Sequence, residues 1–156
     1  VTGVQTCALP ILVRDSGKPD GCGVLFFLQL TVPSGKNPAL SYSRFLECAA
    51  SLSFALTEQR CSHYVIWYDS KDEKLVRCPV RTEEDWTVCL YFLLHAPFYR
   101  EEKDLQDLYQ KMYPSDTWCT SLLLSTGMTL MKNSLDPLLL PLETWQQTLA
   151  GYALTV

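Results

Sequence analysis

The amino-acid sequence predicts an α/β layered domain with a mostly parallel central sheet and a hairpin near the C-terminus. Segments typical of strands alternate with segments typical of helices along the first two-thirds of the 156 residues. The continuous apolar run at residues 24–28 is short and flanked by Gly and Pro. Such a run indicates a strand buried on both faces, as at the centre of a parallel sheet. The chain length suits one domain with a single core.

Composition and charge exclude several classes of protein. Hydrophobic residues make up 47% of the chain and aromatic residues 12%, which excludes disorder as its main state. The net charge of -4, with 13 Lys and Arg in no run, argues against nucleic-acid binding. No apolar stretch reaches the roughly 18 residues that suggest a transmembrane helix. We therefore expect neither nucleic acid nor membrane contact from this part of the protein.

A long helix is expected after the first strand. Residues 33–38, rich in Pro, Gly and Ser, are typical of a loop. Ser41 or Ser43 can cap a helix that runs to about Gln59. Its apolar residues cover a wide face that would pack on the sheet: Phe45, Leu46, Cys48, Ala49, Leu52, Ala55 and Leu56.

A hairpin is expected next. Residues 63–68 are β-branched and aromatic, as strands usually are, and residues 69–74 form a turn. Residues 75–80 form the second arm, and Pro79 places that arm at an edge of the sheet. His63 opens the first arm and is expected at the surface or at an edge.

The clearest helix begins after Thr82. Thr82 with Asp85 three residues later approximates a capping box, and the acidic first turn suits the helix dipole. An amphipathic stripe follows, and Pro97 ends the helix. His95 in the last turn suits the negative end of the dipole. The stripe consists of Trp86, Cys89, Leu90, Leu93 and Leu94.

A second helix is expected over residues 101–112, ended by Pro114, and a strand over residues 118–124. This helix offers four residues to the core: Leu105, Leu108, Tyr109 and Met112. The aromatic residues around it are expected to complete the core and not to form an exposed patch. They are Phe98, Tyr99 and Trp118.

The C-terminal part is expected to hold the hairpin. Its arms are residues 128–131 and 138–140, joined by a turn at residues 133–136. Residues 143–150 then form a short helix, and residues 152–156 a last short strand.

The cysteines show no metal-binding spacing. No two of them form a C-x-x-C pair, and no Cys and His set has zinc spacing. Cys48 and Cys89 fall on apolar helix faces, where a free thiol acts as a small buried hydrophobe. A reducing, cytosolic environment follows from this pattern. The seven cysteines are Cys7, Cys22, Cys48, Cys61, Cys78, Cys89 and Cys119.

No complete catalytic set is present. The G-x-S-x-G, H-E-x-x-H and P-loop motifs are all missing, and the chain has only two histidines, His63 and His95. The acidic residues at 69–73 and 83–85 belong to a turn and to a helix start, where local electrostatics explain them. The sequence thus favours a protein that is not an enzyme.

The first 11 residues differ in character from the rest. Residues 1–11 resemble the conceptual translation of a sequencing-library adapter, and we expect them to be an artefact outside the fold. The domain would then occupy residues 12–156 and be truncated at its start.

Four segments together resemble one bacterial family. They are residues 12–15 (LVRD), 18–21 (KPDG), the strand at 24–28 and the helical stretch 45–56 (FLECAASLSFAL). They resemble the C-terminal part of the domain-of-unknown-function fifty-eight family, whose members accompany MoxR-type AAA+ ATPases. Residues 63–69 also resemble members of this family.

The resemblance implies a von Willebrand factor A-like α/β domain over residues 12–156. In the family, membrane helices and a β-domain lie upstream. The resemblance thus implies a cytoplasmic domain at the inner face of the cell membrane, in a membrane-anchored protein. Its implied partner is a MoxR-type ATPase.

A-type domains carry D-x-S-x-S at the end of the first strand and bind Mg²⁺ there. At the matching positions Gln29 replaces the Asp, Thr31 keeps one hydroxyl and Pro33 replaces the second Ser. Hard cations want oxygen ligands, usually with a carboxylate, so we expect no metal and no other cofactor. Gln29, Thr31 and Ser34 would form a degenerate metal-adhesion loop that takes part in binding.

Two hypotheses of function follow. The first is a non-catalytic protein-interaction module that works with a MoxR-type ATPase. The alternative is a small intracellular α/β enzyme with its site at the carboxyl ends of the strands, near Gln29, Thr31 and Ser34. Such an enzyme would show a concave pocket with perturbed titratable groups. A third interpretation is a fragment with no function of its own.

Overall fold

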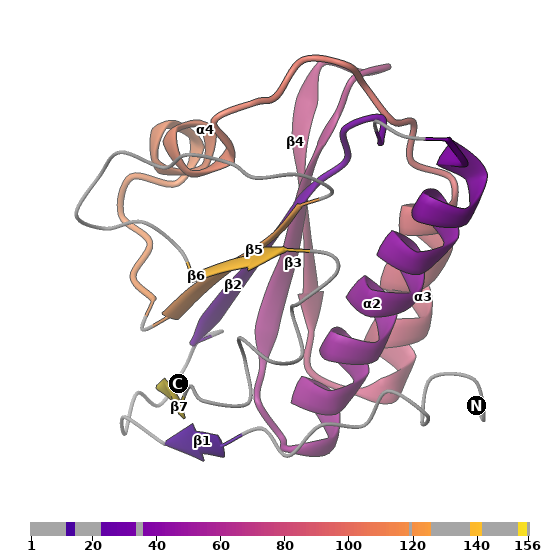
Figure 1. Ribbon diagram of the computed structural model, residues 1–156. Coiled ribbons are helices and arrows are strands. Elements are labelled where there is room, and N and C mark those ends of the chain that lie inside the picture. Colours follow the sequence, from indigo (N-terminus) through magenta and orange to yellow (C-terminus); the bar gives the residue numbers. More distant parts are fainter. Residues whose placement is uncertain are drawn as a thin grey trace.

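The computed structural model describes residues 12–14, 23–33, 36–118, 120–125, 138–141 and 153–155, and Figure 1 shows its ribbon. This part of the chain contains three helices and an open sheet. The helices are α2 (Pro38–Glu58), α3 (Glu83–Leu94) and α4 (Leu105–Met112). The expected α/β class, with strands and helices alternating, is confirmed.

The main sheet is mixed and mostly parallel, with strand order β4-β3-β2-β5-β6. β2 pairs in parallel with β3 and β5, and β5 pairs in parallel with β6, whereas β4 runs antiparallel to β3. The strands are β2 (Val24–Gln29), β3 (His63–Asp69), β4 (Lys74–Val80), β5 (Thr120–Ser125) and β6 (Leu138–Pro141). The central, fully buried strand that residues 24–28 predict is β2.

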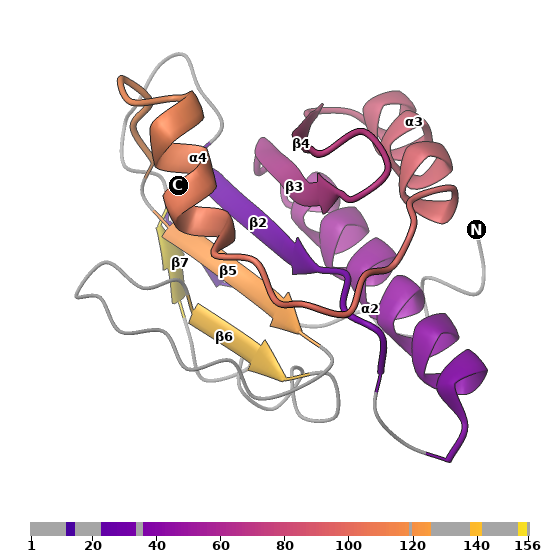
Figure 2. The ribbon, with the colours of Figure 1, turned by 90° about the horizontal axis from the view of Figure 1, so that it is seen from above.

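Helices cover both faces of this sheet. α2 and α3 lie on one face and α4 on the other, as Figures 1 and 2 show from two directions. Side chains of β2 alternate between the two layers. Phe26 and Leu28 pack with residues of α2 and α3, whereas Leu25 and Phe27 pack with residues of α4. This double cover explains the unbroken apolar run, because neither face of β2 meets water.

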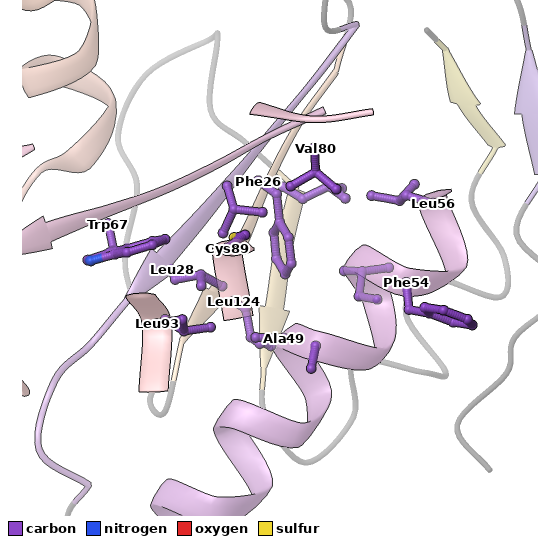
Figure 3. Packing of buried hydrophobic residues seen from close by; sticks show 14 of the residues in the cluster. Phe26, Leu28, Ala49, Phe54, Leu56, Trp67, Val80, Cys89, Leu93 and Leu124 are labelled. Atoms are coloured by element: carbon purple, nitrogen blue, oxygen red, sulfur yellow. The ribbon is translucent and has the colours of Figure 1, made fainter. Parts of the chain in front are cut away.

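The larger core lies between the sheet and the two long helices (Figure 3). Leu28 and Leu124 from the strands meet Ala49 of α2 and Leu93 of α3 in one cluster. Burial of a side chain of this size stabilises the fold by about 1.5–3 kcal/mol. Trp86 also joins the two helices, since its indole Nε1 donates a hydrogen bond of 3.0 Å to the Ala50 carbonyl.

The helix expected from Ser41 or Ser43 begins earlier, so its predicted start is wrong. Asn37 is the N-cap, and its side chain accepts a hydrogen bond of 3.3 Å from the Leu40 amide. Pro38, assigned to a loop from the sequence, occupies the first turn, where its fixed φ suits a helix. The hydroxyls of Ser41 and Ser43 instead donate to carbonyls one turn earlier.

The expected hairpin is confirmed as β3 and β4. The Asp69 carboxylate accepts hydrogen bonds from the Lys71 and Asp72 amides and thereby shapes the turn. β4 is the edge strand of the sheet among the described residues, and its Pro79 is exposed. The edge position that Pro79 predicts is therefore confirmed.

The cap of α3 is confirmed. The Thr82 hydroxyl accepts a hydrogen bond of 3.2 Å from the Asp85 amide, and the Asp85 carboxylate accepts one of 3.0 Å from the Arg81 amide. The predicted stripe is wrong at its end. Leu94 is 57% exposed, because it is the last helical residue before the chain turns toward α4.

α4 starts at Leu105 and not at residue 101, and Asp104 caps it. Leu105 and Tyr109 are buried as expected, but Met112 is half exposed and its prediction is wrong. Tyr113 takes the inward position instead, since its ring lies 3.7 Å from the Arg77 guanidinium. The other aromatics meet the core as expected: Tyr99 is buried, and Phe98 and Trp118 are half-buried against it.

The C-terminal hairpin is only partly within the described residues. Residues 138–141 do form a strand, β6, but it pairs in parallel with β5. Residues 128–131, the other expected arm, and the expected helix at 143–150 lie outside the described residues. The last short strand is confirmed as β7 (Ala153–Thr155), which pairs in parallel with β1 (Leu12–Arg14).

Candidate functional site

The carboxyl end of β2 is where this topology favours a ligand site. Open α/β sheets bind ligands outside the carboxyl ends of parallel strands, at the point where the strand order reverses. Here β3 and β4 follow β2 on one side of it in the sheet, whereas β5 and β6 lie on its other side. The switch point therefore lies between β2 and β5, and Gln29 ends β2 there.

The connection from α3 to α4 crosses this edge of the sheet (Figure 1). The Tyr99 amide donates a hydrogen bond of 2.9 Å to the Leu30 carbonyl, and the Val32 amide donates one of 2.8 Å to the Tyr99 carbonyl. Thr31 and Tyr99 thus form a parallel β-bridge. The bridge extends the line of β2, and Thr31 is buried beside it.

Both ends of the Gln29 side-chain amide form hydrogen bonds within the protein. Its Nε2 donates a hydrogen bond of 2.7 Å to the Lys103 carbonyl. Its Oε1 accepts hydrogen bonds from the Tyr99 hydroxyl and from the Lys103 amide, the latter 3.4 Å long. Gln29 is 1% exposed, so these contacts take the place of hydrogen bonds to water.

Two further side chains surround Gln29 and Tyr99. The Tyr68 ring lies edge-on to the Tyr99 ring at 5.8 Å, and the Lys103 ammonium lies 5.1 Å from the Tyr68 ring. Burial is the main cause that raises the pKa of Tyr99, and the Glu102 carboxylate adds to it. The Tyr99 hydroxyl therefore stays protonated and donates a hydrogen bond to Gln29 Oε1. Gln29, Tyr68, Tyr99 and Lys103 are called the switch-point cluster below.

Two of the three predicted site residues lie in the part of the chain that the structure describes. Gln29 and Thr31 lie together at the switch point, whereas Ser34 lies outside the described residues. Tyr99 and Lys103 are neighbours of Gln29 that the sequence did not reveal, since they are 70 and 74 residues away along the chain. Within the described residues no three His, Cys, Asp or Glu side chains group as metal ligands would.

Replacing Tyr99 by Phe is expected to lower the free energy of unfolding by about 1–3 kcal/mol, because it removes the main donor to a buried amide oxygen. Urea denaturation measures the change. Tyr91→Phe is the matched control, since Tyr91 is 62% exposed. That control should stay within about 0.5 kcal/mol of the wild type. Equal effects of the two substitutions would contradict the role of the Tyr99 hydroxyl.

The prediction that His63 lies at the surface or at an edge is wrong. It is completely buried, between β2 on one side and β4 on the other. Its Nδ1 lies 2.9 Å from the Cys61 carbonyl, and its Nε2 lies 2.7 Å from the Ser53 hydroxyl. A carbonyl only accepts, so Nδ1 carries the proton and Nε2 accepts from Ser53.

The hydrogen bond between the Ser53 hydroxyl and His63 resembles that between a serine nucleophile and its general base. The environment of the pair, however, differs from that of a catalytic site. Both side chains are buried, and the third group is a neutral carbonyl in place of a carboxylate. Burial lowers the pKa of His63 to about 4. The pair also lies at the amino-terminal end of β3, opposite the switch point. It therefore joins α2 to the sheet and has no catalytic geometry.

A second polar cluster joins α4 to the edge strand. The Arg77 guanidinium lies 4.4 Å from the Tyr64 ring and 3.7 Å from the Tyr113 ring. It also donates to the Tyr109 hydroxyl at 3.2 Å and lies 3.5 Å from the Asp116 carboxylate. Burial and the hydrogen bond to Asp116 raise the pKa of Tyr109. The Arg77 guanidinium, the Tyr109 hydroxyl and the Asp116 carboxylate thus bind one another and join α4 to the edge strand.

The outward side of α3 is apolar, which the sequence analysis did not expect. Val88, Tyr91, Phe92 and Leu94 are between 53% and 62% exposed. The Tyr91 ring lies 5.8 Å from the Phe92 ring and 4.6 Å from the His95 ring, so the aromatic groups gather on one side. These four residues are called the α3 face below. Grouped exposed apolar side chains of this kind mark interaction surfaces.

No described helix combines the length and the hydropathy needed to cross a membrane. Comparison of the chain with family models, with curated proteins and with solved structures found no match.

Proposed function

We propose that this domain is a non-catalytic protein-interaction module with a von Willebrand factor A-like fold. In this proposal it is the cytosolic C-terminal part of a membrane-anchored protein, and its partner is a MoxR-type AAA+ ATPase. The α3 face is the surface that meets the partner.

The sheet topology supports the fold part of the proposal. The order β4-β3-β2-β5-β6 places the first strand of the main sheet at its centre, with later strands added on both sides. This is the doubly wound arrangement, here with one antiparallel edge strand. A layered A-type domain has the same central parallel sheet between helices.

The switch-point cluster supports a role without catalysis. A substrate at the carboxyl end of β2 would have to displace the Tyr99 hydroxyl and the Lys103 backbone before it reached the Gln29 amide. A small enzyme that works through Gln29 and Thr31, the alternative function, would need that rearrangement in every cycle. A protein-interaction module that binds through the α3 face does not need the switch-point cluster to rearrange.

The α3 face is the single observation that carries the proposal. Its two aromatic side chains offer large apolar area at low cost in conformational entropy, as interface anchors usually do. The exposed Glu83 and Glu84 lie at the amino-terminal end of the same helix. The complementary partner surface is an apolar groove with basic residues at one end.

The test measures binding between the full chain and the purified ATPase encoded in the neighbouring reading frame, by calorimetry. The double variant Tyr91→Ser and Phe92→Ser is expected to weaken binding at least about tenfold, because interface aromatics carry much of the binding energy. Both side chains are exposed, so thermal unfolding of the variant should match that of the wild type within a few degrees.

Met112→Ser is the matched control, because Met112 is 50% exposed but lies on α4, across the sheet. It should leave binding unchanged. Equal binding by the wild type and the double variant would exclude the α3 face as the contact surface. A neighbouring reading frame without Walker A and B motifs, or an ATPase that does not bind the wild-type chain, would overturn the choice of partner.

A further inference from the structure

The outer edge of β4 carries backbone groups that no described strand pairs with. Among the described strands, β4 ends the order of the sheet and pairs only with β3. In an antiparallel pair, successive residues direct their amide and carbonyl groups alternately toward the neighbouring strand and away from it. Pro79 has no amide hydrogen, which places it among the residues that point away. Leu75 and Arg77 share this alternation with Pro79, so their amide and carbonyl groups also point outward.

Apolar side chains line the same edge on the α3 side of the sheet. Val76 and Cys78 are half-buried and pack against the larger core, so each leaves part of its surface open at the edge. Backbone hydrogen-bonding groups and apolar surface thus lie side by side along the outer edge of β4. A neighbouring strand in a sheet uses both.

Part of the α3 face lies next to this edge. Trp86 turns toward α2, because its indole Nε1 donates to the Ala50 carbonyl. With about 3.6 residues per turn, Val88 and Phe92 lie on the sides of α3 turned away from Trp86. α3 contacts β4 and lies beyond α2 toward the β4 end of the sheet (Figure 2). The exposed Val88 and Phe92 therefore flank the outer edge of β4.

We propose that the outer edge of β4 and the Val88 and Phe92 side of the α3 face form one docking surface. Its occupant is an extended segment of the partner that adds a strand to β4. This inference rests on the proposed function, since the segment belongs to the ATPase. It specifies how the two proteins meet.

The geometry of the edge defines the chemistry of that segment. The residues that pair with Leu75 and Arg77 must supply amide donors, so none of them is proline. Every second side chain of the segment faces the α3 side of the sheet and is apolar, because it contacts Val76, Cys78 and Phe92.

A second copy of this chain fits the edge less well than such a segment. Two β4 strands paired with each other would bring two copies of Pro79 into the ladder, and each lacks a donor. They would also add a second Lys74 to the edge, where this side chain is exposed. A segment of another protein brings neither.

Hydrogen–deuterium exchange of the full chain, read residue by residue, tests the added strand with and without the purified ATPase. In the free chain the Leu75 and Arg77 amides should exchange fast, whereas those of Val76 and Cys78, which point to β3, should exchange slowly. Saturating ATPase should slow exchange at Leu75 and Arg77 at least about tenfold.

The outcomes separate this inference from the proposed function. Slow exchange of the Leu75 and Arg77 amides in the free chain would overturn the added strand. Unchanged exchange in a complex that does form would overturn it too, but would leave the partner in place. If no complex forms, the proposed function fails and the inference falls with it. Protection that depends on the concentration of the free chain would assign the edge to a second copy.

Val76→Glu tests the apolar half of the surface. The free chain leaves part of this position in water, whereas an added strand would bury the new carboxylate. Binding of the ATPase, measured by calorimetry, should weaken at least about tenfold. Val76→Thr is the matched control, because it keeps the branched shape without a charge, and it should stay within about threefold of the wild type. Equal affinities of the two variants would contradict the proposal. The exchange experiment uses the unaltered chain and decides the proposal even where Val76→Glu fails to fold.

Discussion

His63 alone is expected to remove about 3 kcal/mol from the free energy of unfolding as the pH falls from 6.5 to about 4. The imidazole is neutral in the fold, where Ser53 donates to one nitrogen and the Cys61 carbonyl accepts from the other. A protonated ring would have two donors, and the Ser53 hydroxyl oxygen would then have to accept a hydrogen bond within the buried interior. Burial is the largest cause of the lowered pKa.

The sign of the effect follows from proton binding. Between pH 6.5 and about 4 the unfolded chain binds a proton at His63, whereas the folded protein does not. Protons therefore favour the unfolded state in this window, and stability falls as the pH falls. The contribution of His63 is complete above pH 6.5 and is lost by about pH 4.

Urea denaturation at a series of pH values measures this effect. His63→Gln keeps an amide donor and acceptor but does not titrate, so the curve of stability against pH should be flatter by about 3 kcal/mol across the window. His95→Gln is the control, because His95 is exposed at the end of α3. If the stability of His63→Gln fell with pH as steeply as that of the wild type, His63 would not be the group responsible for the pH dependence.

Features with a local cause were predictable from the sequence. The Thr82 cap depends on Asp85 three residues away, and the edge position of β4 follows from the missing amide of Pro79. The apolar run in β2 is likewise a pattern of neighbours. In each case the residues that decide the local structure lie within a few positions of one another, so the sequence pattern alone indicates it.

Features that depend on distant residues were not predictable. Gln29 receives its hydrogen bonds from Tyr99 and Lys103, which are 70 and 74 residues away. The burial of His63 depends on Ser53 of α2 and on its neighbours in β2 and β4. No spacing rule reports such contacts, because they arise only when the layers pack. The α3 face is a different case. Of its four residues only Leu94 was assigned to the core, and the predicted inward stripe leaves Val88, Tyr91 and Phe92 outside it.

Phe26→Ala and Phe27→Ala should both be severely destabilising, although these neighbours in β2 point to opposite faces of the sheet. Each removes a completely buried ring and leaves a cavity, which costs about 3–5 kcal/mol. Phe26 packs in the core under α2 and α3, whereas the Phe27 ring meets the Tyr109 ring of α4 edge-on at 5.8 Å.

Denaturant unfolding of the two variants separates this architecture from a sheet with one wet face. In such a sheet one of the two substitutions would cost little, because one ring would already contact water. Phe92→Ala is the matched control for the residue type, since Phe92 is 53% exposed on α3, and it should change stability by less than about 1 kcal/mol. A small effect of Phe27→Ala beside a large effect of Phe26→Ala would mean that α4 does not cover β2 in solution, and the doubly wound arrangement would lose its second layer.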